Sequence, residues 1–187
     1  MQGKMEEKRK NEKGESVTRV AILLRSEMTE SDWIPDDSGG LPDEDGPVLP
    51  ETGAGSEARH LEIRMFGTLE RRNGRVILSY EETELTGMAG ATTTLSFREG
   101  SPALVTMLRY GAVSTALVFE EGVRHFCTYK TEPYPFEVCI HAHRVINTLS
   151  EEGGALTLDY HVEIQGAKAD HSVLTIAITP VPEEVRD

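Results

Sequence analysis

The sequence lacks most features of a secreted or membrane-spanning protein. It has two cysteines and one tryptophan in 187 residues, and aromatic residues make up only 6% of the chain. Two cysteines without an export signal favour reduced thiols and a cytoplasmic location over a disulfide framework. No apolar run approaches the about 18 residues of a membrane-spanning helix. The charged residues 1–15 contain no apolar segment of the kind that a secretory signal requires.

Positive charge is also scarce. There are 19 lysines and arginines against 32 aspartates and glutamates, which gives a net charge of -13 at pH 7. Such a chain repels phosphate backbones and anionic lipid surfaces, so we expect it to bind neither nucleic acid nor membranes. Nine of the acidic residues and no basic residue fall within residues 29–58, together with four prolines and five glycines. This composition is typical of a linker or an insertion.

The composition predicts one domain with extra segments. Hydrophobic residues make up 38% of the chain, a low share for a compact domain. We expect a disordered charged tail over residues 1–15, because this stretch has no apolar face to offset the entropy of ordering. A single domain over residues 16–180 would contain the acidic insertion at 29–58, and residues 181–187 would form a C-terminal tail.

Apolar and polar residues alternate with a period of two from Arg59 to Thr179. Leu156, Leu158 and Tyr160 alternate with polar residues, which is typical of a half-buried strand, whereas the apolar run at 17–24 suits a strand buried on both faces. Glycine- and proline-containing turn signals separate the runs at short intervals, among them Asn73-Gly74, Glu121-Gly122 and Gly153-Gly154. The alternatives are a two-sheet sandwich and a closed sheet. Consecutive hairpins favour an all-β, closed antiparallel up-and-down β-barrel of about 8–10 strands.

Several segments carry a pattern shared with a known family. They are residues 105–121 (VTMLRYGAVSTALVFEE), residues 129–131 (YKT), Tyr134, Phe136 and residues 156–166 (LTLDYHVEIQG). On these segments the chain resembles the bacterial YwiB-like family of unknown function. The resemblance implies a calycin-like β-barrel, related in shape to lipocalins and fatty-acid-binding proteins, and implies no activity. The chain departs from the family pattern at Pro135, where a glycine is usual, and in its longer acidic insertion.

Arg109 is the best candidate for a contact to a small molecule. It alternates with Val105 and Met107 and therefore shares their face. A guanidinium removed from water needs a carboxylate or phosphate partner, and tyrosine hydroxyls can assist it. A surface arginine beside a tight turn and an internal salt bridge to Glu120 are the alternatives. The full set of candidate ligand contacts is Arg109, Tyr129, Tyr134, Met107 and Phe119.

The cysteines and histidines form the second candidate cluster. If residues 123–130 pair with residues 136–145 about a centre near Pro133, Cys127 faces Cys139 and His125 faces His141. Two thiols and two imidazoles on one face are a zinc set in principle, His143 is a spare ligand, and a disulfide is also conceivable. We favour neither, because a slip of one residue would separate these side chains and ligands in a flat row seldom converge. We predict no cofactor.

The leading interpretation is a cytoplasmic, non-enzymatic barrel that binds a small apolar or anionic molecule in its interior. The first alternative is a structural or protein-interaction module whose barrel is filled, with a homodimer left open. An enzyme of unknown class comes third, because the sequence contains no recognisable catalytic motif. The packing of interior residues such as Met65, Leu95 and Leu117 distinguishes the first two interpretations.

Overall fold

The computed structural model describes residues 15–31, 58–111, 114–129, 136–164 and 168–182. Within these residues there are ten strands and one 3-10 helix, η1 (Glu84–Thr86). The strands are β1 (Ser16–Ser31), β2 (Arg59–Arg72), β3 (Arg75–Glu81), β4 (Thr92–Arg98), β5 (Ser101–Tyr110), β6 (Thr115–Glu120), β7 (Arg124–Tyr129), β8 (Phe136–Asn147), β9 (Gly154–Ile164) and β10 (Lys168–Pro180). β1 therefore extends three residues into the expected insertion. In the described part of the chain, no helix is long and apolar enough to cross a membrane.

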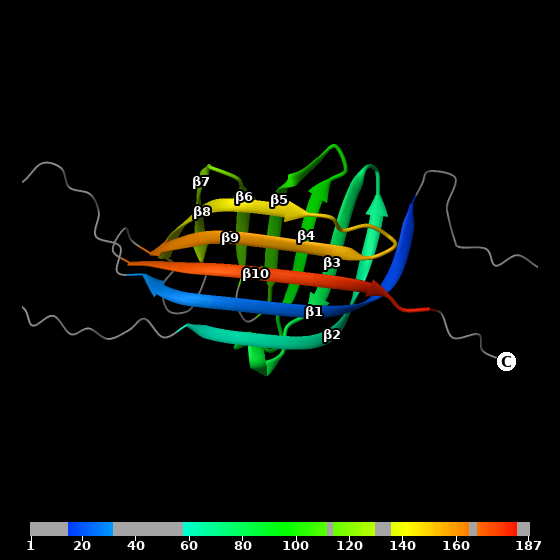
Figure 1. Ribbon diagram of the computed structural model, residues 1–187, viewed down its shortest axis with the longest axis horizontal. Helices are drawn as coiled ribbons and strands as arrows, with labels where there is room; N and C mark the ends of the chain where they lie inside the picture. Colours follow the sequence, from blue (N-terminus) through cyan, green and yellow to red (C-terminus); the bar gives the residue numbers. More distant parts are fainter. Residues whose placement is uncertain (1–14, 32–57, 112–113, 130–135, 165–167, 183–187) are drawn as a thin grey trace, which may run out of the picture.

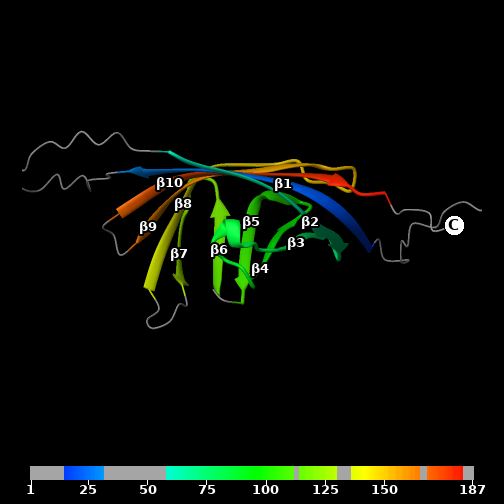
Figure 2. The same cartoon turned by 90° about the horizontal axis from the view of Figure 1, so that it is seen from below.

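The ten strands form a single antiparallel sheet that curls into a nearly closed barrel. The strand order is β6-β5-β4-β3-β2-β1-β10-β9-β8-β7, so every pair of neighbours except β1 and β10 is consecutive in sequence. Figure 1 shows β8, β9, β10 and β1 side by side in one layer, with β3 to β6 crossing it steeply. Figure 2, turned by 90°, shows β3 to β6 below the layer that contains β1 and β10. The predicted all-β, up-and-down barrel is thereby confirmed.

The barrel closes between β6 and β7 without a ladder of hydrogen bonds in the described residues. These strands are joined by the turn at Glu121 and Gly122, yet they form the two edges of the sheet. The Gly122 N–H donates instead to the Ala142 carbonyl of β8 at 2.9 Å, and the Val145 N–H donates to the Glu121 carboxylate at 3.3 Å. The turn signal was therefore correct, but the prediction that it joins a paired hairpin was wrong.

Gly67 allows β2 to take part in both layers. β2 pairs with β1 along most of its length, and its pairing with β3 begins at Gly67, opposite Tyr80. A Cβ atom at this position would lie 2.6 Å from the Ser79 carbonyl oxygen and 2.6 Å from the Ile22 side chain. The bend therefore depends on a residue without a side chain, as is common where sheets curve.

The core lies between the two layers and consists of every second residue along each strand, the residues that point inward. Its largest fully buried members are Phe119, Leu69, Leu78, Leu95, Met107, Ile140, Leu156, Leu158, Ile176, Val20, Val105 and Val138. In β1 only one face is buried. Val20, Ile22 and Leu24 point into the core, whereas Ala21 and Leu23 are half-buried on the outer face. The expectation that this strand is buried on both faces was wrong, because no second layer covers it.

Candidate functional site

A row of polar side chains crosses the inner face of β3, β4, β5 and β6. In the strand register Tyr80 stands opposite Thr93, Thr93 opposite Arg109, and Arg109 opposite Thr115. Each of these residues continues the inward face that its strand otherwise fills with apolar side chains. Tyr80, Thr93 and Thr115 are buried, and Arg109 is mostly so. We call this set the polar row.

Arg109 is paired inside the barrel with Glu82, which follows β3. Its Nε atom lies 3.6 Å from the Glu82 carboxylate, and the two side chains are only 14% and 2% exposed. The Thr93 hydroxyl donates to this carboxylate and accepts a hydrogen bond from Arg109 Nε at 3.3 Å. The structure thus confirms that Arg109 shares a face with Met107. One alternative was a salt bridge to Glu120, but the carboxylate partner of Arg109 is Glu82.

Glu120 lies on the opposite face of the sheet from this ion pair. It follows the inward-facing Phe119 and contacts His125 Nε2 at 3.1 Å. The sequence did not indicate Glu82 as the partner, because that residue lies beyond the end of its strand, where alternation no longer predicts direction.

Five side-chain polar atoms are buried without a hydrogen-bond partner in the described residues. One is the Thr83 hydroxyl at the start of η1, and the other four are at inward-facing strand positions. These four are the hydroxyl oxygens of Tyr80, Thr115 and Ser172 and the Asp170 Oδ1 atom, the last two on β10. Thr93 is near Tyr80, but its hydroxyl is engaged with Glu82 and Arg109, and no hydrogen bond of good geometry reaches the Tyr80 oxygen. Buried polar atoms nearly always have a partner, so an unmatched set calls for a ligand or water.

The environment of Tyr80 shows that the polar row is largely excluded from water. Burial raises the pKa of the Tyr80 hydroxyl strongly, and the Glu82 carboxylate raises it further, whereas the Arg109 charge acts in the opposite direction. This hydroxyl is therefore a neutral hydrogen-bond donor at any physiological pH. The alternation of Val76, Leu78 and Tyr80 along β3 would have indicated its direction from sequence.

Of the other four predicted ligand contacts, the structure describes the side chains of only two, Met107 and Phe119. Met107 and Phe119 are fully buried in the core, and the Phe119 ring packs edge-on against Tyr160 with 4.9 Å between ring centroids. Tyr134 and the side chain of Tyr129 lie outside the described residues, although the Tyr129 backbone ends β7. Their contribution to a ligand site stays a prediction.

The register of β7 and β8 differs by one residue from the one expected. Cys127 stands opposite Val138, and Cys139 stands opposite Phe126. The two cysteines therefore lie on opposite faces of the sheet, and both are free thiols. His125 stands opposite Ile140 and His141 opposite Arg124, so the expected pairings for a zinc set or a disulfide were wrong. Burial raises the pKa of both thiols.

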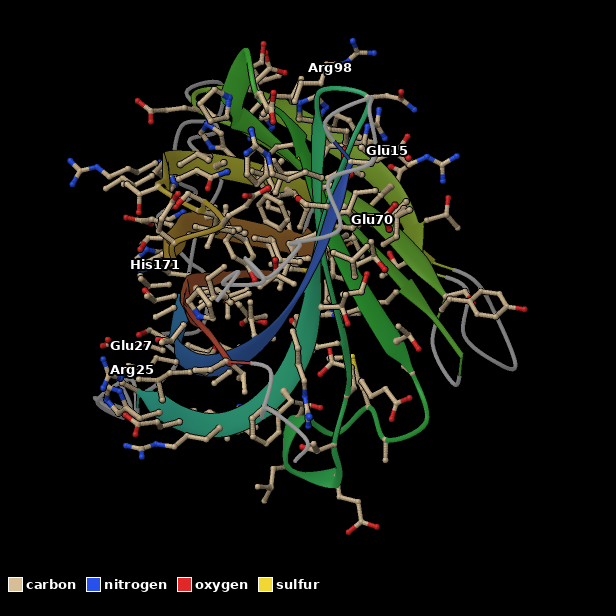
Figure 3. The ribbon with its side chains drawn as sticks, turned by 90° about the vertical axis from the view of Figure 1, so that its right-hand side faces the viewer. Glu15, Arg25, Glu27, Glu70, Arg98 and His171 are labelled. Carbon is tan, nitrogen blue, oxygen red and sulfur yellow. The ribbon has the colours of Figure 1, made fainter. Side chains whose placement is uncertain are left out.

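Four imidazoles gather instead on the outer face of β8, β9 and β10. The His143 ring lies 4.7 Å from that of His141 and 4.6 Å from that of His161, and His161 stacks on His171 at 4.8 Å. His143 Nε2 contacts His161 Nδ1, and His171 Nε2 lies 2.8 Å from the Asp159 carboxylate. Figure 3 labels His171 at this surface. We call these four residues the histidine cluster.

A β-bulge between Ala142 and Arg144 creates the histidine cluster, because it adds His143 to the outer face. Burial lowers the pKa of His141 and His161, and the neighbouring imidazoles lower them further. Protonation of these two imidazoles is therefore disfavoured. In the part of the chain that the structure describes, no three histidine, cysteine, aspartate or glutamate side chains are arranged to hold a metal ion.

Comparison with known proteins agrees with this architecture. The crystal structure of the ywiB protein from Bacillus subtilis superimposes with a TM-score of 0.65 over 89% of this chain and 94% of that chain, at 18% sequence identity. At this identity the likeness concerns the fold alone. No match is found among the curated proteins. The model of a domain of unknown function, DUF1934, matches residues 51–176. The chain therefore belongs to the DUF1934 family, in agreement with its YwiB-like sequence features.

Proposed function

We propose that this protein binds a small molecule inside its barrel, at the polar row, and is not an enzyme. The observation that supports this is that two hydroxyls of the polar row, those of Tyr80 and Thr115, are buried without partners. Asp170 and Ser172 on β10 add two further unmatched atoms on the inner face. An unsatisfied buried polar group costs about 1–3 kcal/mol. A ligand with its own donors and acceptors would offset that cost on binding.

The residues of the site favour a small, partly apolar molecule that carries an acidic or other acceptor group. Arg109 and the Tyr80 hydroxyl can donate to the acceptor group, and Glu82 can accept from a hydroxyl or amine. Met107 and Phe119 supply the apolar wall. The candidate hydroxyls of Tyr129 and Tyr134 would add donors if they reach the same space.

A filled barrel that acts as a structural or interaction module is the second candidate. It is favoured by the complete burial of Leu95, Met107 and Phe119 and by the partner that Arg109 already has. An enzyme of unknown class is the remaining alternative. We place the protein in the cytoplasm, since both of its cysteines are free thiols.

Native mass spectrometry of freshly purified protein tests the proposal, together with displacement of a fluorescent fatty acid. We expect a bound small molecule in the wild type, and Thr115→Val to lower its occupancy while Thr106→Val on the outer face leaves it unchanged. In a filled barrel, Thr115→Val instead removes an unmatched hydroxyl and stabilises the fold. A wild-type mass equal to the bare chain, with no fatty-acid binding and a stabilised Thr115→Val variant, would refute the proposal.

A further inference from the structure

A hollow of about 450 Å³ lies on the outer face of β2, β3 and β4, where the β2–β3 turn is located. It is lined by Arg72, Asn73, Arg75, Ile77 and Arg98, and we call it the arginine groove. The Glu99 N–H at the β4–β5 turn donates to the Gly74 carbonyl of the β2–β3 turn at 3.0 Å, which fixes the two turns against each other. Figure 3 shows Arg98 at this end of the sheet.

The three arginines form a row of like charges across adjacent strands. Arg72 stands opposite Arg75, and Arg75 stands opposite Arg98. Directly opposed side chains on neighbouring strands have Cβ atoms about 5 Å apart, and like charges in such pairs destabilise a sheet. Two such pairs in succession are unexpected in a chain with a net charge of -13. The arrangement carries a cost that a bound anion would remove.

The chain itself neutralises this row only partly. Arg72 lies 3.7 Å from the Glu15 carboxylate. In the described residues no carboxylate lies within ion-pairing distance of Arg75 or Arg98. Glu70 stands opposite Ile77 on the same face, at the edge of the groove. The free positive charge is therefore concentrated on Arg75 and Arg98, next to the two turns.

Three guanidinium groups in a row suit a phosphoryl group better than a carboxylate. A carboxylate has two oxygens and is satisfied by one bidentate arginine, whereas a phosphoryl group has three terminal oxygens and about two negative charges. Strands lie about 4.8 Å apart, so the long side chains of three neighbouring strands can reach one such group. Ile77 would contact an apolar part of the same molecule.

We propose that the arginine groove binds a phosphorylated small molecule or a short polyphosphate through Arg75 and Arg98, with Arg72 as a third donor. This site is separate from the interior site at Arg109 and does not depend on it. Its ligand is defined by the phosphoryl group, and the accompanying part of the ligand is apolar or a second phosphate.

Calorimetric titration with inorganic phosphate, pyrophosphate and glycerol phosphate, at ionic strength matched with sodium chloride, tests this proposal. We expect saturable binding to the wild type, with pyrophosphate tightest if a polyphosphate is preferred and glycerol phosphate tightest if a monoester is. Arg75→Gln and Arg98→Gln should each weaken binding about tenfold or more, because each removes charge-assisted hydrogen bonds. The control Arg64→Gln removes an exposed arginine elsewhere on β2 and should change nothing.

Circular dichroism verifies that each variant is folded. Without ligand, Arg98→Gln should be as stable as the wild type or more stable at low salt, because repulsion is relieved. The proposal is overturned if no phosphate compound binds at millimolar concentration, or if Arg64→Gln weakens binding as much as Arg98→Gln. It is also overturned if binding is lost in Arg109→Met and retained in the groove variants, since the anion would then occupy the barrel interior.

Discussion

Neutralising Glu82 should destabilise the barrel strongly. The Glu82 carboxylate and Arg109 Nε lie 3.6 Å apart, and both side chains are almost excluded from water. At an effective dielectric constant of about 20, two unit charges at this distance attract by about 5 kcal/mol. The cost of desolvation offsets much of this attraction, but removing one partner leaves the other charge buried and unpaired, which costs about 3–5 kcal/mol. We therefore expect Glu82→Gln to lower the free energy of unfolding by about 3 kcal/mol.

A double-mutant cycle isolates the pair. Arg109→Met should cost a similar amount, whereas the double variant removes both charges and should lie within about 1–2 kcal/mol of the wild type. Urea unfolding followed by circular dichroism measures all four free energies, with equal m-values showing that the unfolded states are alike.

An exposed ion pair provides the control for this cycle. Arg25 Nε lies 2.8 Å from the Glu62 carboxylate, at side-chain exposures of 60% and 48%. The shorter distance does not compensate for exposure to water, and Glu62→Gln should leave the free energy of unfolding nearly unchanged. If Glu82→Gln costs as little as Glu62→Gln, or if the two interior variants are simply additive, the interior pair is solvated and the argument from burial fails.

Three further predictions concern stability and reactivity. Burial holds the pKa of His161 below that of a histidine in the unfolded chain, so the unfolded state binds more protons. The free energy of unfolding should therefore fall as the pH drops through about 6.5 and below. His161→Gln should flatten this part of a pH–stability curve. Gly154→Ala should cost about 2 kcal/mol or more, because φ is 121° and a Cβ atom would lie 2.2 Å from a backbone oxygen; Gly100→Ala, in open space, should be neutral in the same thermal melts. Alkylation at pH 7, followed by mass spectrometry, should modify Cys127 before Cys139, which is only 4% exposed. Both thiols should react slowly, because burial raises their pKa and lowers the fraction of reactive thiolate. The number of free thiols counted in denaturant should be the same with and without reductant.

Sequence alternation predicted the inward face of β5 and of β9, although it did not predict that β1 buries only one face. Val105, Met107 and Arg109 share the inner face as expected, and the turn at Asn73 and Gly74 has the positive φ angles, 53° and 70°, that these residues favour. Alternation shows which residues of one strand point to the same face of the sheet. It therefore predicts faces, and with hairpin turns it predicts neighbours in the sheet.

Alternation does not fix the register between two strands, and the errors follow from that. A difference of one residue between β7 and β8 placed Cys127 and Cys139 on opposite faces. The histidine cluster depends on three strands and on the bulge at His143, none of which leaves a local signal in the sequence. The edge formed by β6 and β7 was missed for a similar reason, because a tight turn joins strands whether or not they go on to pair.

The two proposed sites lie on opposite faces of the same strands, near opposite ends. On β3, Arg75 faces the arginine groove and Tyr80 faces the polar row, five residues further along. At about 3.3 Å per residue the two positions are about 16 Å apart, beyond the range at which substitutions usually interact. Arg98→Gln should therefore leave the occupancy of the interior ligand unchanged in native mass spectra, and Thr115→Val should leave pyrophosphate affinity unchanged. Loss of both ligands in either variant would mean that the sheet deforms as a unit, and the two sites would then have to be treated as one.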